Sequence, residues 1–251
     1  MTSNPQFHPA LTENALSHWD KSLTGIKPKD AATLIILDRE HGEPKVLMGR
    51  RHMRHRFMPG MFVFPGGRLD ASDSSVPYSR DINPKVMKKL QHRAKNGSSD
   101  ARMRGLLMCA IRETYEEAGL FLGVKDDDPK IGIEGWEAFT EKGIVPDLDP
   151  FRFIARAITP PGRTRRFDTR FFAVDATHII ERLPEGRGPT EELEDLHWLT
   201  IPEAKNLELP RITLEILDQL EVRLQQDPDF SPNVKTPFYY MVGRKMVQDM
   251  I

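Results

Sequence analysis

Short apolar runs and amphipathic stretches alternate along the chain, which predicts strands interleaved with helices. Strand-length apolar runs lie at residues 31–37, 45–48, 61–64, 151–158, 169–174 and 193–199. Helical patterns lie near residues 14–21, 84–95, 136–142, 202–206 and 212–225. The longest helix is expected to begin at Asp100 as its N-cap and to end at Gly119.

Strands are expected both before and after this longest helix. That arrangement favours an α/β fold in which helices pack on a mixed β-sheet. Residues 1–29 are predicted to be a polar lead-in, and the chain shows no internal repeat and no linker-like segment. We therefore expect a single domain over residues 1–251.

The longest helix carries three carboxylates on one face. Glu113, Glu116 and Glu117 are spaced i, i+3, i+4, which places them in one narrow sector of the helix. Like charges that close repel unless a cation lies between them, and Mg²⁺ is usually held by carboxylates together with substrate phosphates. The alternative is a solvated face with Arg112–Glu116 as an ordinary surface pair. The spacing favours a metal site that handles phosphate.

Residues 112–120 (Arg-Glu-Thr-Tyr-Glu-Glu-Ala-Gly-Leu), taken with Pro65-Gly66-Gly67, resemble the signature of the Nudix hydrolases. The second half of that signature matches at nearly every defined position. The first half departs, because Asp73 stands where Glu is usual and Arg112 follows much later than in most of the family. The resemblance therefore requires an insertion, which we place at residues 74–99. Among subfamilies with an insertion, the chain resembles above all the CoA diphosphatase of peroxisomes.

The resemblance implies a Nudix-like α/β/α sandwich with a mixed β-sheet and an inserted segment before the catalytic helix. A C-terminal helical extension is expected over residues 207–251. The resemblance also implies metal ligands and an orienting arginine. The Mg²⁺ or Mn²⁺ ligands would be Glu113, Glu116, Glu117 and the carbonyl of Gly67, and Arg112 would orient them. The metal would activate a water for attack on a diphosphate.

The backbone around the two glycines is the first candidate for contact with substrate. Without a Cβ, Gly66 and Gly67 let the chain approach a ligand and present a carbonyl to it. Arg68 follows directly and is a further candidate substrate contact.

A basic run at residues 50–56 leads into this glycine segment. Such a run is ordinarily a solvated loop or a nucleic-acid patch. Its spacing is similar to an extra motif of CoA-cleaving Nudix enzymes, with Arg51 and Arg56 at basic positions, although Gly49 replaces Thr and His52 replaces a small residue. Because CoA carries a 3′-phosphate besides its diphosphate, we expect Arg51 and Arg56 to bind substrate.

Two later segments supply further candidates. An arginine-rich turn offers Arg166 for a phosphate and Phe167 for stacking on a base, or else Phe167 is a core residue of a strand. Nudix enzymes often carry another acid near the last strand, where Glu191, Glu192 and Glu194 are all available. The sequence does not choose among these three, and Glu192 is taken as the catalytic candidate.

Composition narrows the setting of this chemistry. The net charge of the 251 residues is −1, which argues against a broad surface for nucleic acid or anionic membrane. The single cysteine, Cys109, excludes an intramolecular disulfide and is interpreted as helix packing. No signal-like start, membrane-length apolar run or Ser-Lys-Leu end is present, so a cytoplasmic location is expected. The oligomeric state stays open, with a homodimer as one alternative.

These patterns together predict a metal-dependent hydrolase with a small nucleotide-type substrate. The resemblance favours CoA or acyl-CoA, cleaved to 3′,5′-ADP and (acyl-)phosphopantetheine. An ADP-ribose or nucleotide-sugar diphosphatase is the first alternative. A non-catalytic Nudix-like module that only binds its ligand is the second.

Overall fold

The computed structural model describes residues 5–40, 42–54, 59–94 and 99–251. Its helices are α1 (Pro9–Ser17), η1 (Lys21–Leu23), η2 (Ser72–Ser75), α2 (Pro84–Gln91), α3 (Asp100–Ala118), α4 (Glu137–Glu141), η3 (Ala176–His178), α5 (Ile201–Lys205) and α6 (Arg211–Gln226). Its strands are β1 (Gln6–Phe7), β2 (Lys29–Asp38), β3 (Lys45–Arg51), β4 (Phe62–Val63), β5 (Gly66–Arg68), β6 (Leu120–Leu122), β7 (Val124–Lys125), β8 (Ile144–Val145), β9 (Arg152–Ile158), β10 (Phe167–Asp175), β11 (Ile179–Arg182), β12 (Leu193–Thr200), β13 (Pro237–Val242) and β14 (Lys245–Met250).

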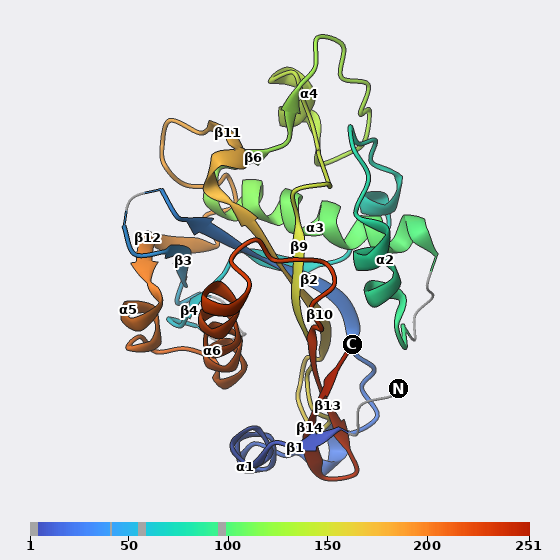
Figure 1. The fold of residues 1–251 in the computed structure, drawn as a ribbon, viewed down its shortest axis with the longest axis vertical. Coiled ribbons are helices and arrows are strands. Elements are labelled where there is room, and N and C mark those ends of the chain that lie inside the picture. The colour runs from blue at the N-terminus through green and yellow to red at the C-terminus, as the bar shows by residue number, and fades with distance from the viewer. Residues whose placement is uncertain (1–4, 41, 55–58, 95–98) are drawn as a thin grey trace.

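One large mixed sheet forms the centre of the molecule (Figure 1). Its strands lie in the order β1-β14-β13-β9-β10-β2-β3-β12, with β4 paired to β3 and β5 paired to β2. β2 and β10 run parallel side by side, whereas β9 and β3 pair antiparallel with β10 and β2 respectively. The predicted α/β class with a mixed sheet is therefore confirmed.

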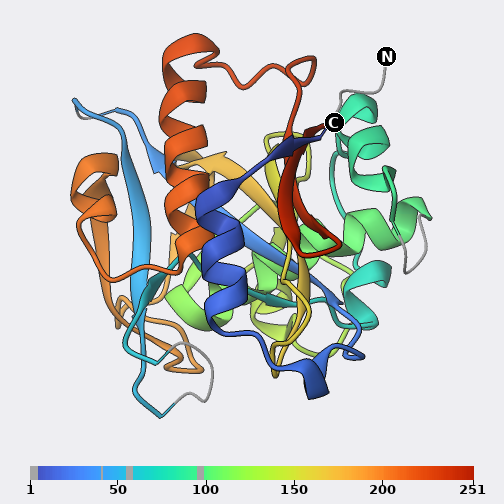
Figure 2. The same ribbon diagram turned by 90° about the horizontal axis from the view of Figure 1, so that it is seen from below.

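Helices cover both faces of this sheet, as the strand periodicity requires. Alternate residues of a strand point to opposite faces. In β2, Leu34 and Ile36 belong to the core under α2 and α3, whereas Ile35 and Leu37 belong to the core under α1 and α6. Figure 2 shows α1 and α6 side by side on one face, with α3 behind the sheet.

The ends of α3 are set by two local features. Ser99, rather than the expected Asp100, is the N-cap, and its hydroxyl accepts a hydrogen bond from the Arg102 N–H at 3.3 Å. Gly119 ends the helix with a left-handed φ of 68°, as expected, and its N–H donates to the Tyr115 carbonyl.

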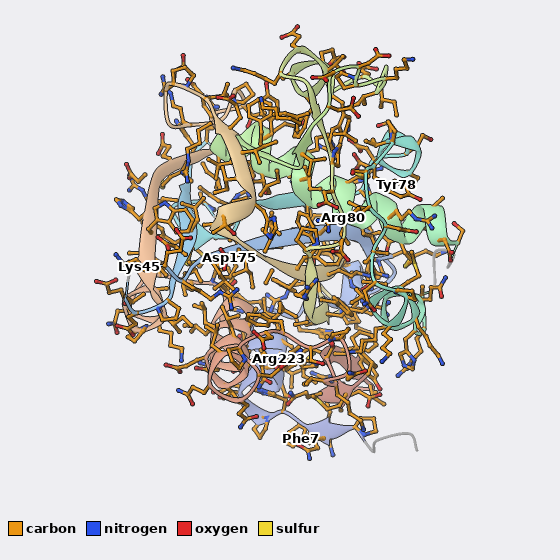
Figure 3. The ribbon with its side chains drawn as sticks, turned by 45° about the horizontal axis from the view of Figure 1, so that its top comes forward. Phe7, Lys45, Tyr78, Arg80, Asp175 and Arg223 are labelled. Carbon is orange, nitrogen blue, oxygen red and sulfur yellow. The ribbon has the colours of Figure 1, made fainter. Side chains whose placement is uncertain are left out.

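The described part of the 74–99 insertion packs along the N-terminal half of α3. Val86, Met87 and Leu90 of α2 are buried in the same core as α3. Figure 3 shows Tyr78 and Arg80 beside that helix. The Tyr78 ring lies 5.4 Å from the Arg104 guanidinium carbon, and Arg80 pairs with Asp147.

Two features of the chain path were not predicted. The apolar run at residues 61–64 did not predict that Gly66–Arg68 forms a further strand, β5, which pairs with β2 from Ala31 to Thr33. The segment 207–251 is not helical throughout, because α6 is followed by the antiparallel hairpin β13–β14. Among the described residues, no helix is both long enough and apolar enough to cross a bilayer.

Candidate active site

The carboxylates of α3 lie against the glycines of β5. The Gly66 N–H donates to Glu117 Oε2 at 2.9 Å, and Glu117 is 2% exposed. A Cβ at Gly67 would lie 2.3 Å from the Glu113 carboxyl carbon, so only glycine lets that side chain come so close. The structure thus brings Gly66, Gly67, Glu113 and Glu117 together.

Arg112 is the hub of this cluster. Its Nε and Nη2 donate to Asp73 Oδ1 and Oδ2 at 2.9 and 3.1 Å, and its Nη1 donates to both Glu113 Oε1 and Glu116 Oε2 at 2.9 Å. Although burial opposes the charged form, the Asp73 hydrogen bond and the Glu113 charge raise the pKa of Arg112. Arg112 is therefore a permanent cation whose fork is fixed by Asp73 and which holds two of the candidate ligands.

The glutamates are crowded and poorly solvated. Burial, opposed by Arg112 and reinforced by Glu116, raises the pKa of Glu113 to about 7. Burial together with the Glu113 charge raises the pKa of Glu117 well above its usual value. Both shifts mean that negative charge here lacks compensation.

A hard divalent cation with oxygen ligands suits this donor set, because it would compensate the buried negative charge. As the side chains stand, no group of three or more His, Cys, Asp or Glu in the described part of the chain is arranged to hold a metal ion. Arg112 takes up carboxylate oxygens of Glu113 and Glu116 instead.

Arg51, at the end of β3, and Glu192, directly before β12, border the cluster. Arg51, the last residue of β3, places Nη1 3.8 Å from Glu117 Oε1 and donates from Nη2 to Glu192 Oε2 at 3.3 Å. The Glu192 charge also contributes to the raised pKa of Glu113 and Glu117, after burial and nearer charges. The structure thus brings Arg51 and Glu192 to the glutamates, and their roles in binding and catalysis stay predictions.

The structure distinguishes Glu192 from its two neighbours. Glu191 is exposed and lies 3.6 Å from Arg187. Glu194 lies 3.1 Å from His52 Nε2. Glu192 is the one of the three whose carboxylate meets Arg51 beside Glu117.

The loop that leads to Glu192 is fastened to the C-terminal end of α3. The N–H of Gly188 donates to the Glu117 carbonyl at 3.3 Å, and the N–H and hydroxyl of Thr190 donate to the Glu116 carbonyl at 3.1 and 2.7 Å. These bonds satisfy carbonyls that the end of a helix leaves unpaired. A Cβ at Gly188 would lie 2.1 Å from the Glu116 carbonyl oxygen. Sequence reasoning missed both residues, since only the packed helix end reveals their role.

Several predicted contacts are placed elsewhere or differently. Arg68 contacts the cluster through its backbone, because its carbonyl accepts a hydrogen bond from Arg112 Nη2 at 3.3 Å. Arg68 as a whole is an exposed residue. Cys109 is fully buried, as expected of helix packing, and its Sγ lies 3.5 Å from the Gly67 carbonyl oxygen. Arg56 lies outside the described residues.

Arg166 and Phe167 are not brought to the glutamates. Phe167 pairs with Lys29 at the start of β2, whereas Gly67 pairs with Ala32, about 10 Å further along that strand. The Arg166 guanidinium donates to the carbonyls of Thr159 and Ile26, at 2.9 and 2.5 Å. Arg166 and Phe167, the first residue of β10, therefore lie apart from the glutamates, and their roles as substrate contacts stay predictions.

Comparison with known proteins agrees with this geometry. The sequence model of the NUDT19 Nudix domain matches residues 28–210. The chain is similar to the acyl-coenzyme A diphosphatase NUDT19 of Xenopus laevis, with 26% identity over 79% of this chain and 70% of that protein. It is also similar to the human protein of that name, with 27% identity over 51% of this chain. This match spans about half of the human protein, at 47% of its length.

A solved structure shows the same fold. The crystal structure of a NUDIX hydrolase from Alicyclobacillus acidocaldarius matches with a TM-score of 0.61 and 27% identity, over 80% of this chain and 97% of that one. The family match covers well over half of the chain and includes every residue of the glutamate cluster. The protein belongs to the Nudix hydrolase family, in the branch described by the NUDT19 Nudix domain.

Proposed function

We propose that the protein is a divalent-metal-dependent diphosphatase that cleaves CoA or acyl-CoA to 3′,5′-ADP and (acyl-)phosphopantetheine. The observation that carries the reaction type is the cluster of the buried Glu117 with the half-buried Glu113 and Glu116, beside an Arg112 fixed by Asp73. The names of the NUDT19 relatives support the substrate class.

Mg²⁺ or Mn²⁺ is the proposed cofactor. Glu113, Glu116, Glu117 and the Gly67 carbonyl would hold it, because they offer oxygen donors and an excess of buried negative charge. When bound, the metal would activate a water and offset the charge of the diphosphate. Arg112 would hold Glu113 and Glu116 in position through its two 2.9 Å contacts.

The remaining roles follow from position and charge. Arg51 would bind a diphosphate oxygen, since its Nη1 already lies 3.8 Å from Glu117 Oε1. Glu192, whose side chain is 41% exposed, would accept the proton of the attacking water. Gly66 and Arg68 would line the same site through the backbone of β5.

A substrate panel tests this proposal. Purified protein with Mg²⁺ is incubated with CoA, an acyl-CoA, ADP-ribose, NADH and a dinucleoside polyphosphate, and the products are identified by mass spectrometry. We expect CoA or acyl-CoA to have the highest kcat/KM and to release 3′,5′-ADP. Preferred cleavage of ADP-ribose would contradict the substrate and leave the reaction type standing. Absence of turnover with every compound would contradict both and favour a module that only binds.

A further inference from the structure

A cavity of about 540 Å³ has a lining that includes none of the glutamates and no residue of α3. Residues 24–28, the start of β10 and the middle of β13 contribute to its wall, close to the β13–β14 hairpin in the lower part of Figure 1. Its wall residue Asp168 is joined through Arg170 to Asp30, which accepts from Arg102 Nε at 3.0 Å. Arg102 precedes Glu113 by 11 residues (113 − 102), which corresponds to about 16 Å along the helix. The cavity is thus separate from the site described above.

Three cations line this cavity, and their carboxylate partners are few. Lys27 and Arg166 have no ion pair within the described ranges. Arg93 lies 3.9 Å from Asp249 and donates from Nη1 to the Tyr240 hydroxyl at 2.8 Å. The bonds of Arg166 to the Thr159 and Ile26 carbonyls use Nε and Nη1, which leaves Nη2 for a ligand. Burial lowers the pKa of Arg166, because no carboxylate offsets its desolvation.

The acid in the wall does not neutralise these cations. Asp168 is 3% exposed and accepts from Arg156 at 2.8 and 2.6 Å, and it lies 3.3 Å from Arg170 Nη1. Two buried arginines therefore already use its single charge. Arg170 also has a buried Nε without a hydrogen-bond partner among the described residues. The cavity and the layer behind it carry an excess of positive charge.

The rest of the wall is apolar and partly aromatic. Phe238 and Tyr240 lie with their ring centroids 4.7 Å apart, and Ile158 and Met241 belong to the same wall. A volume of about 540 Å³ lies within the usual range for small-ligand sites, roughly 300–1,000 Å³. The ligand that matches is small and joins a flat, weakly polar part to a strong anion.

We propose that this cavity is a second binding site and that its ligand is a nucleoside phosphate. The phosphate would meet Lys27, Arg93 and the free Nη2 of Arg166, because guanidinium and ammonium groups are the protein's strongest phosphate donors. The base would lie along Ile158 and Met241, the partly exposed apolar residues of the wall, beside Tyr240, because the Phe238 ring is 2% exposed and lies under Arg156. This inference does not depend on which diphosphate is cleaved at the glutamates.

Calorimetric titration of the 251-residue protein with AMP, in EDTA and without divalent metal, tests the proposal. EDTA suppresses nucleotide binding at the glutamates, whose own charge repels an anion. We expect one AMP per chain and much weaker binding of both adenosine and inorganic phosphate. Arg166→Gln, which keeps an N–H donor but removes the charge, should weaken AMP binding about tenfold or more. Lys27→Met should also weaken it, and this change in an exposed residue does not threaten the fold.

Arg165→Gln is the matched control, because Arg165 is an exposed neighbour that does not line the cavity. Its AMP affinity should equal that of the unmodified protein. Glu117→Gln should also bind AMP normally, so a loss of turnover in that variant is distinguishable from a failure of this proposal. Absence of AMP binding would overturn the inference. So would unchanged affinity in both Arg166→Gln and Lys27→Met, or lost AMP binding in Glu117→Gln.

Discussion

Asp73 and Arg112 are 39 positions apart in the sequence and form a two-pronged ion pair, with both residues buried. The intervening chain, in its described part, leaves the site through η2 and packs α2 along the other half of α3. The insertion separates the two halves of the Nudix signature in the sequence, but the Asp73–Arg112 ion pair brings them into contact in the fold. Asp73 therefore positions Arg112, and Arg112 positions Glu113 and Glu116.

Removing the Asp73 charge should damage both stability and turnover. Asp73→Asn removes the buried two-pronged partner of Arg112 and leaves Glu113 and Glu116 as its carboxylate contacts, so the free energy of unfolding should fall by less than the roughly 3–5 kcal/mol of a fully broken buried pair. Turnover should fall about 10–100-fold, because the ligands lose the group that orients them. Thermal unfolding and kcat measured on the folded fraction test both effects.

Asp70→Asn is the matched control for that variant. Asp70 approaches the same arginine at 3.7 Å, but its side chain is 58% exposed. An exposed pair contributes at most about 1 kcal/mol. Equal losses in Asp70→Asn and Asp73→Asn would contradict the role given to Asp73.

The strands and helices with strong patterns could be predicted from the sequence, and so could the glutamate face. β2, β3, β9, β10 and β12 all lie where apolar runs predicted them. The three-residue strand Gly66–Arg68 could not be predicted, because glycines disfavour strands unless a neighbour approaches as closely as β2 and Glu113 do. The role of Asp73 was also hidden, since its partner lies on the far side of an insertion.

The metal-free protein should become more stable when Glu117 is replaced by Gln. The raised pKa of Glu117, caused by burial and by Glu113, means that its ionised form is disfavoured in the fold relative to the unfolded chain. Ionisation therefore costs stability as the pH rises above about 4.5, the usual glutamate range. Gln cannot ionise and can still accept the Gly66 hydrogen bond, so Tm in EDTA at pH 7 should rise, by about 2–4 °C per kcal/mol relieved.

In Mg²⁺, the unmodified protein should have a higher Tm than Glu117→Gln, the reverse of the order expected in EDTA. Saturating Mg²⁺ should raise the Tm of the unmodified protein and have a smaller effect on Glu117→Gln, because a ligand stabilises only the state that binds it. Glu181→Gln, a change in a half-buried glutamate of β11, should follow the unmodified protein in both conditions. A Tm for Glu117→Gln below that of the unmodified protein in EDTA would show that the Glu117 charge does not destabilise the metal-free fold.

Replacement of Glu191, Glu192 and Glu194 in turn should have very different effects on kcat. Glu192→Gln should lower kcat by about 10²–10⁴-fold, the range for a general base, since Glu192 meets Arg51 beside Glu117. Glu191→Gln and Glu194→Gln should stay within about twofold, because those side chains pair with Arg187 and His52. A large loss of kcat in Glu191→Gln or Glu194→Gln, with Glu192→Gln still active, would assign the general base to that other residue.

Gly188→Ala should destabilise the protein by more than about 2 kcal/mol, because the new Cβ would meet the Glu116 carbonyl oxygen at 2.1 Å. The loop that holds Gly188 and Thr190 would then move away from the C-terminal end of α3, and Glu192 would be displaced from the glutamates. Gly25→Ala, which meets nothing within 4 Å, is the control for stability. Urea unfolding of both variants decides, and equal midpoints would contradict the loop's role.

The substrate contacts illustrate what spacing cannot decide. The spacing ahead of the glycine segment pointed to Arg51, and the structure places its guanidinium beside Glu117 and Glu192. Arg166 follows a turn whose path depends on two long-range carbonyl contacts, and no local pattern encodes those. The cytoplasmic location and the homodimer stay predictions.

The most direct measurement is the rate of CoA cleavage at a series of Mg²⁺ concentrations, for the unmodified protein and Glu117→Gln. We predict saturable activation by Mg²⁺, no activity in EDTA, and a rate for Glu117→Gln lower by more than about 100-fold at saturating Mg²⁺. Cleavage by Glu117→Gln at the unmodified rate, or full activity in EDTA, would contradict the assignment of the glutamate cluster as the catalytic metal site.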